Sequence, residues 1–108
     1  INLPLAPDIL DRPRQQVDFE EGKDALTDYE FTACANGRSR VAFRPLTGRT
    51  HQLRVHAASA RGLAMPIVGD RLYGTAAPGE RLHLHAQTVE FTFPLDGHRY
   101  TFTSPTPF

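Results

Sequence analysis

The chain has 108 residues, of which 40% are hydrophobic and 22% charged, and its twelve basic side chains balance twelve acidic ones. This size and composition describe one small globular domain and exclude a low-complexity or disordered chain. The single cysteine excludes an internal disulfide and a cysteine zinc site and favours a cytoplasmic location, and no apolar run approaches the ~20 residues of a membrane span.

The net charge is zero, but acidic and basic residues are distributed unevenly along the chain. Residues 1–30 carry eight acids against three bases, whereas residues 31–69 carry six arginines and no acid. Eleven of the twelve basic residues are arginine, which favours bidentate contacts over a diffuse positive field. We therefore expect a local site more than a general nucleic-acid-binding patch.

The amino-terminal part, residues 1–23, predicts an extended, irregular arm that lies over another part of the molecule. Its three prolines remove hydrogen-bond donors, and its pattern shows little alternation. Because the chain opens on Ile1 rather than on methionine, we expect it to be a piece of a longer protein. Residues 24–108 should then form sheet, helix and sheet.

A first hairpin is predicted by alternation over residues 27–33, the turn Asn36-Gly37, and a partner strand over residues 40–44. A second is predicted by a long strand over residues 82–93 and the turn Asp96-Gly97, which leads into a return strand. The segment between residues 65 and 80 is typical of a loop.

One helix is predicted between the hairpins, from His51 to Arg61, with Thr50 as N-cap and Gly62 as the C′ residue. Positions 53, 56, 57 and 60 should face the core. The fold class is therefore α+β, a mixed and mainly antiparallel sheet with one principal helix. We expect the sheet to continue into sequence outside this chain.

The densest cluster of reactive side chains is the run Thr47-Gly-Arg-Thr-His-Gln-Leu-Arg-Val-His-Ala-Ala58. It combines arginine forks with backbone N–H groups at a strand-to-helix transition, which suits phosphate or carboxylate. Arg54 should lie between core and cleft. There it either pairs with an acid such as Asp70 or points at an active-site carboxylate or a phosphate. Arg49 is either a phosphate contact or a solvated turn residue.

The five histidines raise the question of a metal site, but their spacing matches no metal-binding motif, and we expect none. His56 is predicted to be a core histidine with its hydrogen bonds satisfied. Tyr73 could stack against a base, but we expect it to pack. Leu82 and Leu84 are as consistent with the core as with a wall against which a base stacks.

Three ordered motifs carry a resemblance: residues 47–56, Pro66-Ile-Val-Gly-Asp-Arg-Leu-Tyr-Gly74 and Arg81-Leu-His-Leu-His-Ala86. Together they resemble the carboxyl-terminal half of the catalytic domain of RluA-type pseudouridine synthases, over essentially all of residues 1–108. The segments Asp11-Arg-Pro-Arg-Gln15 and Gly22-Lys23 resemble the RluA subgroup, which lacks an S4-like RNA-binding domain. Met65 departs from the family, which commonly has histidine there.

The resemblance implies an enzyme that isomerises uridine to pseudouridine in RNA, with no metal and no cofactor. In that family an aspartate of a His-Arg-Leu-Asp segment attacks the flipped-out nucleotide, and Arg54 matches the arginine that pairs with it. The remaining site residues would shape the nucleotide and phosphate pocket and wall the base: Thr47, Gly48, Arg49, His51, Gln52, Leu82 and Leu84.

No His-Arg-Leu-Asp segment exists in this chain. We therefore expect the chain alone to be inactive and to lack the amino-terminal half of its domain, with an apolar face left exposed or covered by a second copy. The expected partner of the parent enzyme is RNA, a stem-loop of large-subunit rRNA or also of tRNA. A non-catalytic RNA-binding module and a β-rich interaction domain are the alternatives.

Overall fold

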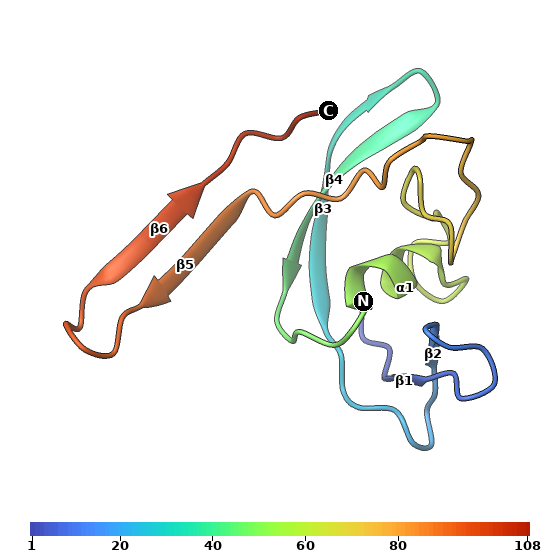
Figure 1. Ribbon diagram of the computed structural model, residues 1–108, viewed down its shortest axis with the longest axis horizontal. Helices are drawn as coiled ribbons and strands as arrows, with labels where there is room; N and C mark the ends of the chain where they lie inside the picture. Colours follow the sequence, from blue (N-terminus) through green and yellow to red (C-terminus); the bar gives the residue numbers. More distant parts are fainter.

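The computed structural model describes residues 1–108 as one helix and three antiparallel strand pairs (Figure 1). β1 pairs with β2, β3 with β4, and β5 with β6. The α+β prediction with antiparallel pairing is confirmed, although the strands form three separate two-stranded sheets. The elements are β1 (Leu5–Pro7), β2 (Gln15–Val17), β3 (Thr27–Ala35), β4 (Arg38–Pro45), α1 (Gln52–Ala58), β5 (Thr88–Thr92) and β6 (Arg99–Thr103).

The core is small and lies where the amino-terminal arm crosses the helix. Only ten of the 108 residues are buried, and the apolar cluster consists of Leu5, Ala25 and Val55 with Val17 and Tyr73 packed against it. The arm is therefore less irregular than predicted. It folds back on itself as β1 and β2, because the apolar side chains of these strands find cover against α1.

Helix α1 is shorter than the predicted span of residues 51–61, and both predicted caps are wrong. Its N-cap is His51, whose backbone is left-handed with φ 56°, and its C-cap is Ser59. Beyond the helix the chain turns back so closely that a Cβ on Gly62 would lie 2.0 Å from the carbonyl oxygen of His56. This glycine is thus needed for a close approach and not for a helix cap.

The buried face of α1 consists of Gln52, Val55, His56 and Ala57. Two of the four predicted core positions, His56 and Ala57, are confirmed. Leu53 is half-buried and Ala60 is exposed, because the helix ends before residue 60 and its periodicity no longer applies.

The first hairpin agrees with its prediction. Asn36 and Gly37 turn it with φ of 54° and 72°, and Tyr29 lies opposite Phe43 in the β3–β4 register. The predicted long strand over residues 82–93 is wrong, since only Thr88–Thr92 is a strand. The start of the predicted strand is bonded to a loop, since the His83 N–H donates to the Val68 carbonyl oxygen at 2.8 Å, whereas the Gln87 carbonyl oxygen accepts the Ser104 N–H beside the β5–β6 hairpin.

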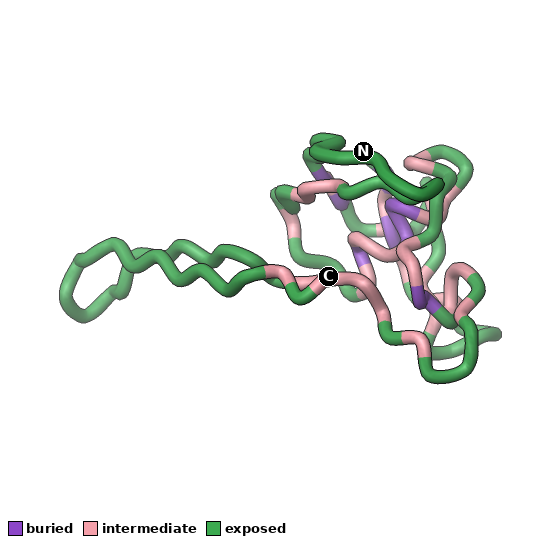
Figure 2. Tube along the Cα trace, turned by 90° about the horizontal axis from the view of Figure 1, so that it is seen from above, coloured by how far each residue is buried: buried purple, intermediate pink, exposed green.

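The β5–β6 hairpin projects from the rest of the molecule, as Figure 1 shows in face view and Figure 2 from above. The radius of gyration is 15.4 Å, whereas a compact chain of this length would have about 13 Å. The predicted exposed apolar face is confirmed on both long hairpins. Its exposed members are Tyr29, Phe31, Val89, Phe91, Phe93, Tyr100 and Phe102.

The single seven-residue helix is too short to cross a membrane.

Candidate functional site

The turn between β4 and α1 is held by the side chains of Thr47 and Gln52. The Thr47 hydroxyl accepts the Leu26 N–H at 2.9 Å and donates to Oε1 of Gln52 at 2.7 Å. Oε1 also accepts the Arg49 N–H at 3.0 Å. Gln52 is buried, and its amide nitrogen donates to the Leu26 carbonyl and the Thr27 hydroxyl, so these two residues shape the turn from within.

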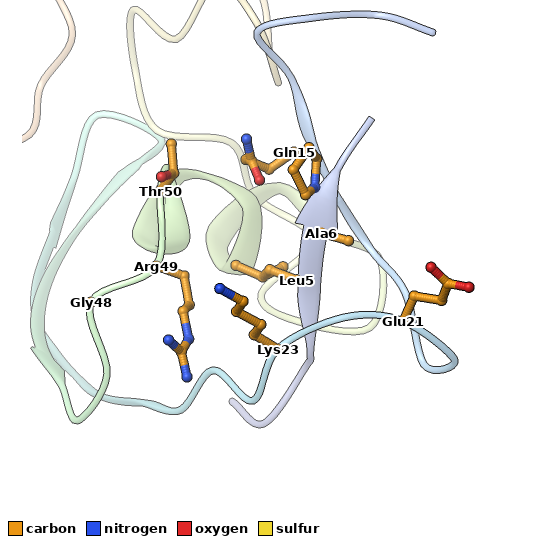
Figure 3. Close-up of a pocket in the computed structure, with 9 residues that line it drawn as sticks. Leu5, Ala6, Gln15, Glu21, Lys23, Gly48, Arg49 and Thr50 are labelled. Atoms are coloured by element: carbon orange, nitrogen blue, oxygen red, sulfur yellow. The ribbon is translucent and has the colours of Figure 1, made fainter. Parts of the chain in front are cut away.

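An open pocket of about 320 Å³ lies between this turn and the β1–β2 arm. Figure 3 shows Lys23 and Arg49 among the residues that line it, with Gly48 and Thr50 at the turn. Nε of Arg49 donates to the Asp24 carbonyl oxygen at 2.7 Å, which fixes the side chain. Neither cation forms a salt bridge, but the carboxylate of Glu21 also lines the pocket, so the lining carries one net positive charge.

Arg54 projects from α1 onto the turn that follows Gly69. Its Nε lies 3.0 Å from Oδ2 of Asp70 and its Nη2 lies 2.7 Å from Oδ1, a bidentate pair. The Arg54 side chain is 19% exposed and that of Asp70 is not exposed at all. The pairing with Asp70 that the sequence left open is therefore present, and Nη1 of Arg54 has no partner.

Asp70 is held as a carboxylate. Its Oδ1 also accepts the N–H groups of Leu72 and Tyr73 at 3.0 and 3.1 Å. Burial alone would raise the pKa of Asp70, but the Arg54 hydrogen bond and the two backbone donors outweigh burial and lower it. The Asp70 hydrogen bond raises the pKa of Arg54 in turn. The pair is charged at neutral pH.

Tyr73 lies under this pair and joins it to His51. Its ring centroid is 5.3 Å from the Arg54 guanidinium carbon, and its hydroxyl lies 2.7 Å from Nδ1 of His51. The same hydroxyl accepts the Gln15 N–H of β2 at 2.8 Å. The side chain is thus predicted correctly as packed, but the sequence did not indicate that it connects Arg54 and His51.

His56 is the core histidine that the sequence predicts. It is fully buried, with Nδ1 2.8 Å from the Thr27 hydroxyl and Nε2 2.9 Å from the Leu3 carbonyl oxygen. Burial lowers its pKa, so it is neutral. Two other histidines, His83 and His85, contact the backbone carbonyls of Arg81 and Ser104.

Leu82 and Leu84 are half-buried in the irregular segment that follows the loop. The backbone of residues 81 and 82 lies against Gly69, where a Cβ would meet the Arg81 carbonyl oxygen at 1.9 Å. The structure thus brings this segment beside the turn that carries Asp70. Lys23 and Tyr73 are the members of the site that the sequence did not assign to it. The signals for them were that Lys23 is the sole lysine and belongs to the Gly22-Lys23 segment of the resemblance, and that Tyr73 belongs to an ordered motif.

Comparisons with known proteins agree with this picture. A family profile described as "RNA pseudouridylate synthase" matches residues 1–59. The chain is 43% identical over 112 residues to the "Dual-specificity RNA pseudouridine synthase RluA" of Escherichia coli (strain K12), covering 100% of this chain and 50% of that protein. The protein of the same name from Haemophilus ducreyi is 44% identical over 113 residues, covering 98% of this chain and 49% of the relative. The chain spans about half the length of the curated relatives it matches.

Proposed function

The chain belongs to the RNA pseudouridylate synthase family, and from that premise we propose that its parent protein isomerises uridine to pseudouridine in stem-loops of large-subunit rRNA and of tRNA. In this reaction the bond between C1′ and N1 breaks and a bond between C1′ and C5 forms, while C5 loses a proton and N1 takes one up. The relatives are named dual-specificity RNA pseudouridine synthases, which supports two classes of RNA. An RNA substrate also favours a cytoplasmic location.

The observation that supports this proposal most strongly is the hydrogen bonding of the Arg54 guanidinium. Asp70 uses only Nε and Nη2 of the guanidinium, so the third nitrogen is available for a second anion. The resemblance assigns that anion to the nucleophilic aspartate of a segment outside this chain. A partly buried carboxylate needs a charge-assisted partner to stay ionised and oriented, and Nη1 can supply one. The 108 residues then form one side of an active site.

The pocket beside Arg49 is the proposed position for an RNA phosphate. Lys23 and Arg49 provide two cations, and Gly48 leaves the backbone of the turn open, since a Cβ there would meet nothing within 4 Å. Phosphate contacts orient an RNA without reading its sequence. Thr47 and Gln52 contribute by shaping the turn, and Leu82 and Leu84 would wall the flipped base.

Tritium release from stem-loop RNA labelled at C5 of uridine tests the reaction. The full-length parent should release tritium, Arg54→Ala should abolish the release, and the 108-residue chain alone should release none. Turnover by the chain alone would show that the nucleophile lies within it and would overturn the proposal.

RNA binding by the full-length protein tests the phosphate pocket separately. Lys23→Gln should reduce the slope of log affinity against log salt by about 1, the loss of one phosphate contact. Arg38→Gln is the matched control, because Arg38 begins β4 and the turn follows the other end of that strand, about 26 Å away. Salt-dependent binding without any tritium release by the full-length protein would favour the non-catalytic RNA-binding module.

A further inference from the structure

Tyr73 contacts both His51 and Arg54 from outside the helix. Its ring packs edge-on against the imidazole, with centroids 5.6 Å apart at 78°, and lies below the guanidinium. Its hydroxyl contacts His51 and the backbone of β2. The contact spans 22 positions in the sequence and links the loop after Asp70 to the start of α1.

The hydrogen atoms of this cluster can be assigned by counting donors and acceptors. The phenol has one O–H to donate, and its oxygen already accepts the Gln15 N–H at 2.8 Å. Nδ1 of His51 is the one acceptor within reach of that O–H, at 2.7 Å. The oxygen could also accept from an Nδ1–H, but its own O–H would then have no acceptor in the protein. The arrangement that satisfies both the phenol O–H and Nδ1 has the phenol donating to Nδ1.

The charge state of His51 agrees with this assignment. Burial and then the positive charge of Arg54 lower the pKa of His51, and these effects outweigh the opposite effect of Asp70. The ring is neutral at pH 7. A neutral imidazole that accepts at Nδ1 carries its proton on Nε2. That N–H has no protein partner.

The backbone at His51 shows that the position of this ring is imposed by its surroundings. His51 has φ 56° and ψ 19°, in the left-handed region that a residue with a Cβ adopts at a cost of about 1–2 kcal/mol. Such conformations persist where neighbouring contacts determine them. The Tyr73 hydroxyl bond is the only side-chain hydrogen bond of His51.

We propose that Tyr73 is a positioning residue that holds His51 in the Nε2–H tautomer, so that His51 offers a hydrogen-bond donor to an acceptor oxygen of the RNA beside Nη1 of Arg54. This inference rests on the proposed function for the identity of the ligand. The acceptor oxygen belongs either to a backbone phosphate or to a uracil carbonyl. The tautomer itself is a property of the protein without RNA.

Nitrogen NMR of the full-length protein with ¹⁵N-labelled histidine tests the tautomer directly. The two ring nitrogens of His51 should show the pattern of a single Nε2–H form. Tyr73→Phe keeps the ring under Arg54 but removes the hydroxyl, and it should convert the signals to those of mixed tautomers. Tyr100→Phe is the matched control, since it removes a hydroxyl bonded to Asp96 on the projecting hairpin. An Nδ1–H form in the wild type would overturn the proposal even if the enzyme is active.

A double-mutant cycle tests the function of the contact. His51→Ala should lower kcat/KM by about tenfold, the loss of one hydrogen bond, and Tyr73→Phe should lower it by less, because part of the protein keeps the Nε2–H tautomer. If Tyr73 acts through His51, adding Tyr73→Phe to His51→Ala should have no further effect. An equal loss in both backgrounds would show that Tyr73 acts through the β2 arm or through Arg54 and would overturn the proposal.

Binding to a modified RNA identifies which group of the RNA holds the acceptor oxygen. In this RNA a neutral methylphosphonate replaces one phosphate at or beside the target uridine. Wild type should lose about tenfold in affinity for this RNA if the acceptor is a phosphate, whereas His51→Ala should bind modified and unmodified RNA equally. If both RNAs bind the wild type equally while the cycle shows coupling, the acceptor is the uracil carbonyl. Absence of turnover on every RNA would remove the proposed function and leave the tautomer result intact.

Discussion

At the scale of single residues, the Arg54–Asp70 pair shows how burial decides how much an ion pair contributes to stability. The chain provides its own comparison, because Arg99 and Glu90 form a similar contact at 3.1 Å with side chains 62% and 52% exposed. Asp70→Asn should destabilise the full-length protein by about 2–3 kcal/mol, because it leaves Arg54 partly buried without a counter-charge. Glu90→Gln should cost less than about 1 kcal/mol. Urea unfolding measures the loss of stability in both variants. Equal losses would contradict the claim that burial makes the Arg54–Asp70 pair the more important one.

The same carboxylate makes stability depend on pH. The folded-state pKa of Asp70 is lowered, so the unfolded state takes up a proton first as the pH falls through the ordinary aspartate pKa of about 3.9. The contribution of Asp70 is therefore complete above that value and is lost as the pH falls through the folded pKa. The gap in unfolding free energy between wild type and Asp70→Asn should shrink over this range, and a gap that stays constant down to acid pH would show that the charge is not responsible.

At the scale of elements, one hydroxyl connects β3 to α1. Thr27 is fully buried, and its Oγ1 accepts from Nε2 of Gln52 at 2.9 Å and donates to Nδ1 of His56. Thr27→Val keeps the shape but leaves Nδ1 of His56 without a partner and Nε2 of Gln52 with the Leu26 carbonyl oxygen alone, which should cost about 2–4 kcal/mol. Thr27→Ser keeps the hydroxyl and should cost less than about 1.5 kcal/mol for the lost methyl group. Thermal unfolding of both variants checks the difference, and the prediction fails if serine is as damaging as valine.

The loop that carries Asp70 needs a glycine at position 69 because another segment packs closely against it, and not only because of its positive φ. Gly69 and Gly79 both have positive φ, 81° and 78°, but only at Gly69 would a Cβ meet a neighbouring backbone. Gly79→Ala should therefore cost only about 1 kcal/mol of strain. Gly69→Ala must separate the 81–82 segment from the loop, and it should lower both stability and tritium release. Similar effects of the two alanines would mean that this close approach is unimportant.

The elements that could be predicted are those that local chemistry determines. The turns at residues 36–37 and 96–97 and the pairing of β3 with β4 follow from short-range patterns. The ends of α1 and the segment 82–87 could not be predicted, because contacts between distant segments decide them: Gly62 against His56, and His83 against Val68. Likewise the run of residues 47–58 indicated Arg54, whereas Lys23 and Tyr73 reach the site only through the fold.

At the scale of the whole molecule, the exposed apolar surface needs a cover. On the β5–β6 hairpin, Val89 lies opposite Phe102 and Phe91 opposite Tyr100, with all four side chains exposed on one face. The other face is polar and carries the Arg99–Glu90 pair. An isolated two-stranded hairpin is at best marginally stable in water. The curated relatives are about twice as long as this chain, and we propose that the remaining half of the catalytic domain packs on this face.

This proposal predicts how the chain behaves by itself. Each buried aromatic side chain stabilises an interface by roughly 2–3 kcal/mol, so without its cover the apolar face should drive concentration-dependent self-association. Sedimentation velocity should show this association, and Phe91→Thr with Phe102→Thr should abolish it while keeping the strand propensity. Glu90→Gln with Arg99→Gln, on the polar face, is the matched control and should leave it unchanged. Co-expression with the preceding segment of the parent should replace self-association by a one-to-one complex. A chain that stays monomeric at all concentrations and captures no such segment would show that the β5–β6 face needs no cover.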